Sequence, residues 1–82
     1  MEIFLKPNPA TDWITFDYKL PEGETSAILL ITEPTGKIIE TLSLEGNRGQ
    51  ELLDTRNYIS GAYLYQMILG EMNLPGKFII VK

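Results

Sequence analysis

The 82-residue sequence contains no cysteine and no histidine. Without cysteine the chain has no disulfide framework and no thiolate metal site, and without histidine it lacks the commonest general base and zinc ligand. Basic residues are also few, since 7 of them stand against 11 acidic residues, a formal charge of 7 − 11 = −4. No two basic residues are adjacent, so no basic patch for nucleic acid is expected. We therefore expect a protein that is not an enzyme, with no metal, no cofactor and no nucleic-acid partner.

Long hydrophobic runs are absent as well. The longest, Ala27–Ile31 and Phe78–Val81, fall far short of the roughly 20 residues of a membrane-spanning helix, so we expect no membrane insertion. The opening residues Met1–Leu5 lack the basic start and the apolar length of a secretory signal peptide. We expect either a cytoplasmic protein or a fragment of a longer secreted precursor. The length allows one domain, residues 1–82.

Helical patterns are poor, because 5 prolines and 7 glycines interrupt the chain. Residues 13–20 instead alternate in polarity, with four apolar side chains on one face, as in a half-buried strand. These four are Ile14, Phe16, Tyr18 and Leu20. The same criteria predict seven strands: Ile3–Lys6, Trp13–Leu20, Ser26–Glu33, Lys37–Leu44, Gln50–Asp54, Ala62–Leu69 and Gly76–Lys82. Seven short strands and no helix predict an all-β fold, an antiparallel immunoglobulin-like β-sandwich, with a barrel as the alternative.

Turn residues support this assignment. Glu33–Gly36 predicts a tight hairpin turn in which Gly36 takes a positive φ. Gly61 followed by Tyr63 is typical of the tyrosine corner of Greek-key sandwiches. We interpret Gly70–Lys77 as a hairpin loop. It is no phosphate loop, because five residues separate its glycines and Phe78 stands where serine or threonine is needed.

Exposed aromatic rings would indicate a different class of function, sugar binding. The predicted strand phases place Tyr18, Tyr63 and Tyr65 in the core or at its rim, and leave Trp13 on the opposite, exposed face. A carbohydrate-binding or adhesive module of fibronectin type III kind, attached to a secreted enzyme, therefore stays open as an alternative. Asp12 is interpreted as a turn residue, because the spacing of a calcium loop is absent.

Four motifs, taken together and in order, resemble one known family. They are Lys6-Pro7-Asn8-Pro9-Ala10-Thr11-Asp12, Thr35-Gly36-Lys37 with Ile38-Ile39, Leu53-Asp54-Thr55 with Ile59-Ser60-Gly61-Ala62-Tyr63-Leu64-Tyr65, and Gly76-Lys77-Phe78-Ile79-Ile80-Val81-Lys82. In this combination the chain resembles the type A C-terminal sorting domain of the type IX secretion system, also called the Por secretion system, over essentially its whole length.

The resemblance implies an immunoglobulin-like domain that directs a covalently fused N-terminal cargo through the outer-membrane translocon of Gram-negative bacteria. It implies translocon components and a sortase-like peptidase as partners, with the domain usually removed. The expected route is the periplasm in transit, then the cell surface or the extracellular space. Carried over by position, the family motif residues, mainly structural, are Pro7, Asn8, Pro9, Gly36, Lys37, Gly61 and Tyr63.

The segment expected to be recognised by the translocon and the peptidase is the last strand: Gly76, Lys77, Phe78, Ile79, Ile80, Val81 and Lys82. If this strand lies at a sheet edge, a receptor strand could pair with its main chain. Lys77 and Lys82, both expected to be solvated, would then take part in recognition, guard an apolar strand against aggregation, or do both. Pro75 would remove one hydrogen-bond donor at that edge.

Overall fold

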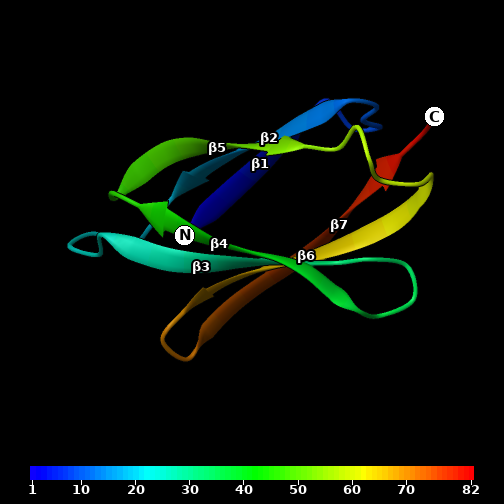
Figure 1. Ribbon diagram of the computed structural model, residues 1–82. Helices are drawn as coiled ribbons and strands as arrows, with labels where there is room; N and C mark the ends of the chain where they lie inside the picture. Colours follow the sequence, from blue (N-terminus) through cyan, green and yellow to red (C-terminus); the bar gives the residue numbers. More distant parts are fainter.

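The computed structural model describes residues 1–82, which form seven β-strands (Figure 1). The strands are β1 (Glu2–Lys6), β2 (Trp13–Lys19), β3 (Ser26–Thr32), β4 (Ile38–Glu45), β5 (Arg48–Asp54), β6 (Gly61–Leu69) and β7 (Met72–Ile80). The chain has no helix that is long and apolar enough to cross a membrane. The seven predicted strands are all present.

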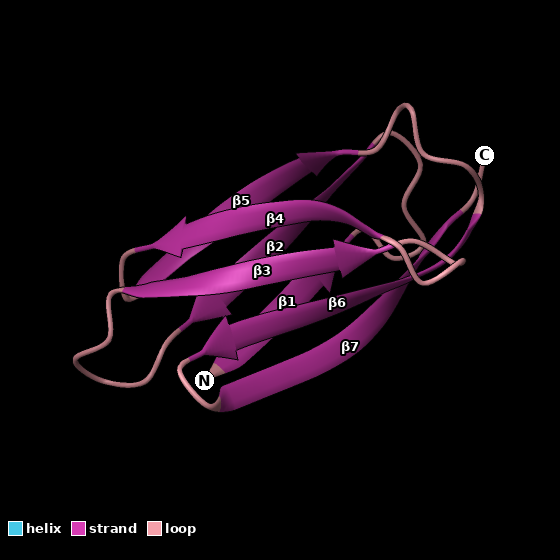
Figure 2. Ribbon diagram, turned by 60° about the horizontal axis from the view of Figure 1, so that its bottom comes forward, coloured by secondary structure: helices cyan, strands magenta, loops and turns pink.

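The strands form two antiparallel sheets, one of three strands in the order β1-β2-β5 and one of four in the order β4-β3-β6-β7. Figure 1 shows the sheets as two layers, and Figure 2 shows β7 at the margin of the larger one. Each sheet keeps two free edges and neither closes on itself, so the fold is the immunoglobulin-like sandwich and not the barrel.

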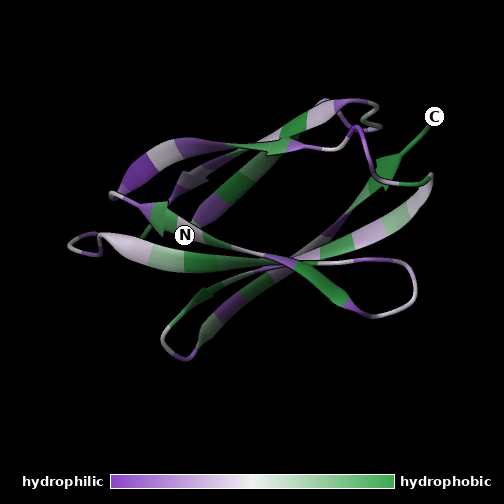
Figure 3. Cartoon of the chain, in the orientation of Figure 1, coloured by the Kyte–Doolittle hydropathy of each residue, from purple (hydrophilic) through white to green (hydrophobic).

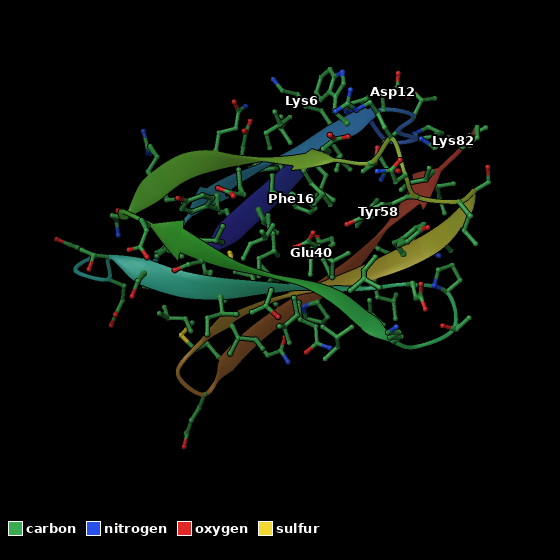
Figure 4. The ribbon with its side chains drawn as sticks, viewed as in Figure 1. Lys6, Asp12, Phe16, Glu40, Tyr58 and Lys82 are labelled. Atoms are coloured by element: carbon green, nitrogen blue, oxygen red, sulfur yellow. The ribbon has the colours of Figure 1, made fainter.

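The core lies between the layers, because the strands alternate between inward apolar and outward polar side chains. Bands of opposite hydropathy follow one another along β5 and β6 in Figure 3. On β2, Ile14, Phe16 and Tyr18 are buried as the alternation predicts. Phe16 lies at the centre of the core (Figure 4), edge-on to the rings of Tyr65 and Phe78 at centroid distances of 5.8 Å.

Two predicted turns are confirmed. Gly36 has φ = 95° and its N–H donates to the Glu33 carbonyl at 2.9 Å, which closes the β3–β4 hairpin. The hydroxyl of Tyr63 donates to the carbonyl of Ile59 at 2.7 Å, the bond of a tyrosine corner.

The interpretation of Gly70–Lys77 as a loop is wrong. β7 begins at Met72, and its first pair, Met72 with Leu69, leaves only Gly70 and Glu71 as the turn. Gly70 has φ = 59°, which lets so short a turn close. Gly76 therefore lies in the middle of the strand rather than opening it, and Val81 and Lys82 lie beyond its end. The polarity of Asn73 and the presence of Pro75 suggested a loop, but an edge strand accepts both.

Candidate recognition site

The predicted recognition segment lies along one edge of the four-stranded sheet, because β6 is the only strand that pairs with β7. In an antiparallel pair, successive residues alternate between main-chain groups that bond to the partner strand and groups that point away from it. The carbonyl of Ile79 points away from β6, since it accepts a hydrogen bond from the N–H of Ala10 at 2.8 Å. By alternation, Asn73, Pro75 and Lys77 also direct their main-chain groups away from β6.

The C-terminal part of this edge is covered by the chain itself, through the three residues Asn8–Ala10. Asn8 Oδ1 accepts a hydrogen bond from the N–H of Ile79 at 3.0 Å. Beyond it, the N–H of Val81 donates to the carbonyl of Ala10 at 2.9 Å, and Ala10 forms a parallel bridge with Ile80. We call Asn8–Ala10 the edge-covering segment. It acts as a very short additional strand.

The N-terminal part of the edge is open. No hydrogen bond outside the sheets involves the main chain of Asn73, Pro75 or Lys77. All three residues are exposed. Pro75, paired with Gln66 across the ladder, sits at a position whose nitrogen faces outward, so its missing N–H costs the sheet no bond. We call residues 73–77 the open edge.

Two residues of the predicted segment are core residues. Phe78 is 0% exposed and Ile80 is 1% exposed. The ring of Phe78 stacks on that of Tyr63 with a centroid distance of 5.5 Å and an interplanar angle of 16°. These side chains hold β7 to the sandwich and are not available to a partner.

Gly76 is held by its cross-strand neighbour Tyr65. The Tyr65 ring lies over the glycine, so that a Cβ added at Gly76 would overlap the ring atoms. The same arrangement recurs on the other sheet, where the Tyr18 ring lies over its neighbour Gly49, with the Tyr18 hydroxyl oxygen 2.6 Å from an added Cβ. A tyrosine that covers a facing glycine supplies the packing that the glycine lacks, so Gly76 has a structural role.

The two lysines of the segment differ. Lys77 is exposed, and its side chain makes no hydrogen bond and no salt bridge. Lys82 is also exposed as a whole residue, but its side chain is only 29% exposed and its ammonium group is not freely solvated. Its ammonium group donates to the carbonyls of Thr11 and Thr55, at 2.5 and 2.8 Å, and lies 3.8 Å from Asp12 Oδ1. Figure 4 shows Lys82 and Asp12 at the same end of the sandwich.

Thr55 belongs to the third family motif, but no role was predicted for it from the sequence, and the structure shows that its carbonyl accepts a hydrogen bond from Lys82. It is completely buried, and its hydroxyl donates to the Thr11 carbonyl at 2.8 Å while its N–H donates to the Asp12 carbonyl at 2.9 Å. It thus joins the β5–β6 loop to the β1–β2 connection. The motif Leu53-Asp54-Thr55 does not indicate that this threonine is buried, because its side-chain partner Thr11 and its partner Lys82 lie 44 and 27 positions away.

The remaining motif residues occupy corners. Pro7 and Pro9 are exposed in the β1–β2 connection, where both of their preceding peptide bonds are cis. The carbonyl of Lys37 accepts from the Glu33 N–H at 2.9 Å in the β3–β4 turn. A Cβ at Gly61 would come within 2.9 Å of Pro34 Cγ. The contacts of Lys37 and Gly61 agree with a structural role for these two residues.

Titratable groups are perturbed at the same end of the molecule, without forming a catalytic constellation. Hydrogen bonds from Arg56 lower the pKa of the Asp54 carboxyl to about 2, and both side chains are exposed. Burial, and secondarily the charge of Glu40, raises the pKa of Tyr58 to about 12. The Tyr58 hydroxyl has no hydrogen-bond partner, and its ring stacks on Tyr63 at 5.4 Å. No three acidic side chains gather where they could hold a metal ion.

The aromatic rings give no support to a sugar-binding platform. Tyr18, Tyr63 and Tyr65 are buried, as predicted, and Trp13 is exposed, as predicted. Trp13 lines an open groove of 440 Å³ with Leu52 and the Asp54–Arg56 pair, but no second aromatic ring lines this groove.

The comparison with known families gives one match. Residues 4–81 match the model of a family described as the secretion system C-terminal sorting domain. The match runs from β1 to the residue before Lys82 and so includes the edge-covering segment and the whole of β7. No curated protein matches the chain.

Proposed function

This chain belongs to the family of secretion system C-terminal sorting domains, and we propose that it carries a covalently fused cargo protein across the outer membrane. The family makes it a type IX secretion sorting signal, which interacts with the type IX machinery and marks a protein for the cell surface or the extracellular space. Such domains are in general not catalytic. The finer steps that follow are part of the proposal.

In this proposal the cargo passes through the periplasm, the domain is recognised by the outer-membrane translocon, and a sortase-like peptidase then removes it. Recognition takes place at residues 76–82. Within that segment Phe78 and Ile80 hold the strand in place, while Lys77 and Val81 present side chains to a partner. Support for this division comes from burial, since Phe78 and Ile80 are at most 1% exposed and Val81 is 49% exposed.

The observation that carries the proposal is the family match over residues 4–81, in a fold that leaves β7 at a sheet edge. An exposed edge strand is a template for strand addition, and folded proteins usually guard it. The open edge, which only Pro75 and Lys77 guard, fits a surface that has a specific partner.

The test is an export assay in a type IX-competent cell. The domain is fused to the C-terminus of a periplasmic reporter, and reporter is measured in the medium and on the cell surface. The variant Lys77→Glu/Val81→Glu is compared with Lys19→Glu/Leu52→Glu, which makes the same charge change at exposed positions of the other sheet, Leu52 being 63% exposed. We expect the first variant to lose export and the second to keep it.

Three outcomes are informative. If the unaltered domain leaves the reporter in the periplasm, the sorting function fails for this chain. If both double variants export like the unaltered domain, export does not depend on the side chains of Lys77 and Val81. Cleavage is read from the size of the exported reporter, and a reporter that keeps the full domain contradicts removal by a peptidase. Thermal unfolding of each purified fusion shows whether the variants remain folded.

A further inference from the structure

We propose that the partner binds by adding an extended strand to the open edge, residues 73–77, and that this added strand carries a carboxylate close to Lys77. The inference rests on the proposed function and states how a partner recognises β7. It also places the main-chain contact earlier in β7 than residues 79–81, because the main-chain groups of Ile79 and Val81 are already bonded to the edge-covering segment.

The main chain supplies the first argument. At the open edge the N–H and C=O of Asn73, the C=O of Pro75, and the N–H and C=O of Lys77 point away from β6 without a partner. Main-chain groups of this kind are strong obligatory donors and acceptors, and no other group of the chain satisfies them here. An extended peptide would convert them into a regular ladder, which is how strand addition gains its affinity.

The edge-covering segment supplies the second argument, because it shows the same edge accepting a strand within the molecule. Asn8 and Ala10 satisfy both main-chain groups of Ile79, and Ala10 also satisfies the N–H of Val81. An incoming strand can therefore run along β7 only as far as Lys77, where Asn8 begins the covered part. The covered part thus sets one limit of the binding site.

Charge supplies the third argument. Lys77 is an exposed cation with no ion pair, on a chain whose formal charge is −4. Its cross-strand neighbour on β6 is Leu64, which is 51% exposed and offers no charge. Opposite charges on neighbouring strands stabilise pairing. A partner strand with a carboxylate near Lys77 and an apolar side chain near Leu64 would fit this surface.

The experiment separates the main chain from the side chain in the same reporter export assay. Lys77→Pro removes both the lysine side chain and the outward N–H, without touching a β6–β7 bond, whereas Lys77→Ala removes only the side chain, so the difference between the two variants reports the main chain. Ser43→Pro is the matched control on β4, the opposite edge of the same sheet. Ser43 lies opposite Ile28, and alternation across β7, β6, β3 and β4 directs its N–H outward.

We expect Lys77→Pro to export about tenfold less reporter than Lys77→Ala, the equivalent of one lost main-chain bond. Ser43→Pro should export like the unaltered domain, and export of Lys77→Ala should lie between that of Lys77→Pro and that of Ser43→Pro. Lys77→Arg, which keeps the positive charge, should keep export, whereas Lys77→Glu should lose it. Equal losses in Lys77→Pro and Lys77→Ala would overturn strand addition and leave side-chain recognition. Export of Lys77→Pro at the unaltered level would overturn the inference, while the sorting function would stand because the unaltered fusion is exported.

Cross-linking identifies the molecule that binds at the open edge. The photoreactive residue p-benzoylphenylalanine replaces Asn73 in one fusion and Ser43 in a second fusion for comparison. We expect a cross-link to a translocon protein from position 73 and none from position 43. A cross-link from position 73 only to a second copy of the fusion would make this edge a self-association surface and overturn the inference. Thermal unfolding of both proline variants, expected to be cooperative and similar, excludes a folding defect as the cause of lost export.

Discussion

The two halves of β7 are held by the rest of the molecule in different ways. From Phe78 onward, aromatic packing, the edge-covering segment and the Lys82 ammonium fix the chain. From Asn73 to Lys77 only the β6 ladder and the Tyr65 ring hold it, and the outer main chain is free. A single strand thus combines an anchor with a surface that can accept a partner, and the anchored half keeps the open half in register.

The largest effect is expected in the anchored half. Phe78→Ala removes a completely buried ring that contacts both Tyr63 and Phe16, and it should lower the free energy of unfolding by about 3–5 kcal/mol. Urea unfolding measures this. Val81→Ala, at an exposed position three residues on, should change stability by less than about 0.5 kcal/mol. Similar losses for both would remove the distinction between anchor and surface.

Gly76→Ala tests the structural role at the boundary between the halves. The added methyl group overlaps the Tyr65 ring, and forcing such an overlap should cost about 1–3 kcal/mol of stability. In a Tyr65→Ala background the methyl group has room, so the same change should cost far less. A double-mutant cycle gives the coupling between the two residues, and simple additivity would contradict the assignment of Gly76 as a packing residue.

The two lysines should differ in their contribution to stability as the two halves of β7 do, with the larger contribution from Lys82. Lys82→Ala removes the ammonium that joins the Thr11 and Thr55 carbonyls, and we expect a loss of about 1 kcal/mol. Lys77→Ala, at an exposed side chain without an ion pair, should stay within about 0.5 kcal/mol of the unaltered protein. Denaturant titration measures the free energy of unfolding of both variants. A larger loss of stability for Lys77→Ala than for Lys82→Ala would contradict this comparison.

The smallest effect at neutral pH is expected at Tyr58, which stacks on the Tyr63 ring that in turn covers Phe78. Its pKa is raised to about 12, so the folded state holds the phenolic proton more tightly than the unfolded state, whose pKa is 10.0. Its contribution is complete below pH 10 and is lost as the pH rises towards 12.

The variant Tyr58→Phe is the check. It removes a hydroxyl that has no hydrogen-bond partner, so it should not destabilise the protein at pH 7 and should weaken the loss of stability in alkali. The measurement is the free energy of unfolding from pH 7 to pH 11. A steeper alkaline loss in the variant than in the unaltered protein would contradict this assignment, as would a large destabilisation at pH 7.

Much of the fold could be predicted because its signals are local. The alternation of Ile14, Phe16 and Tyr18 identifies β2 and its buried face, and Gly36 and Tyr63 identify two corners. The start of β7 could not be predicted in this way. Pro75 and Asn73 have low strand propensity, and only the pairing of Gln66 with Pro75 at an outward-facing position shows why the strand tolerates a proline.

The candidate site was predicted less completely. The motifs located the C-terminal half of β7, with Lys77 in it and Lys82 beyond its end, and the position of β7 at a sheet edge agrees with the expectation. The sequence did not show that Asn8–Ala10 covers part of that edge, since Asn8 and Ile79 are 71 positions apart. For the same reason Lys82 was expected to be solvated, although its ammonium contacts Thr11 at a separation of 71.

What the amino-acid order decides alone is the set of strands, the faces they bury and the family to which the chain belongs, because alternation, turn residues and motifs are properties of neighbours along the chain. Which half of β7 is anchored and which is open depends on the sandwich as a whole. Main-chain donors look alike in every residue except proline, so only the folded arrangement decides that Ile79 finds a partner in Asn8 while Lys77 finds none.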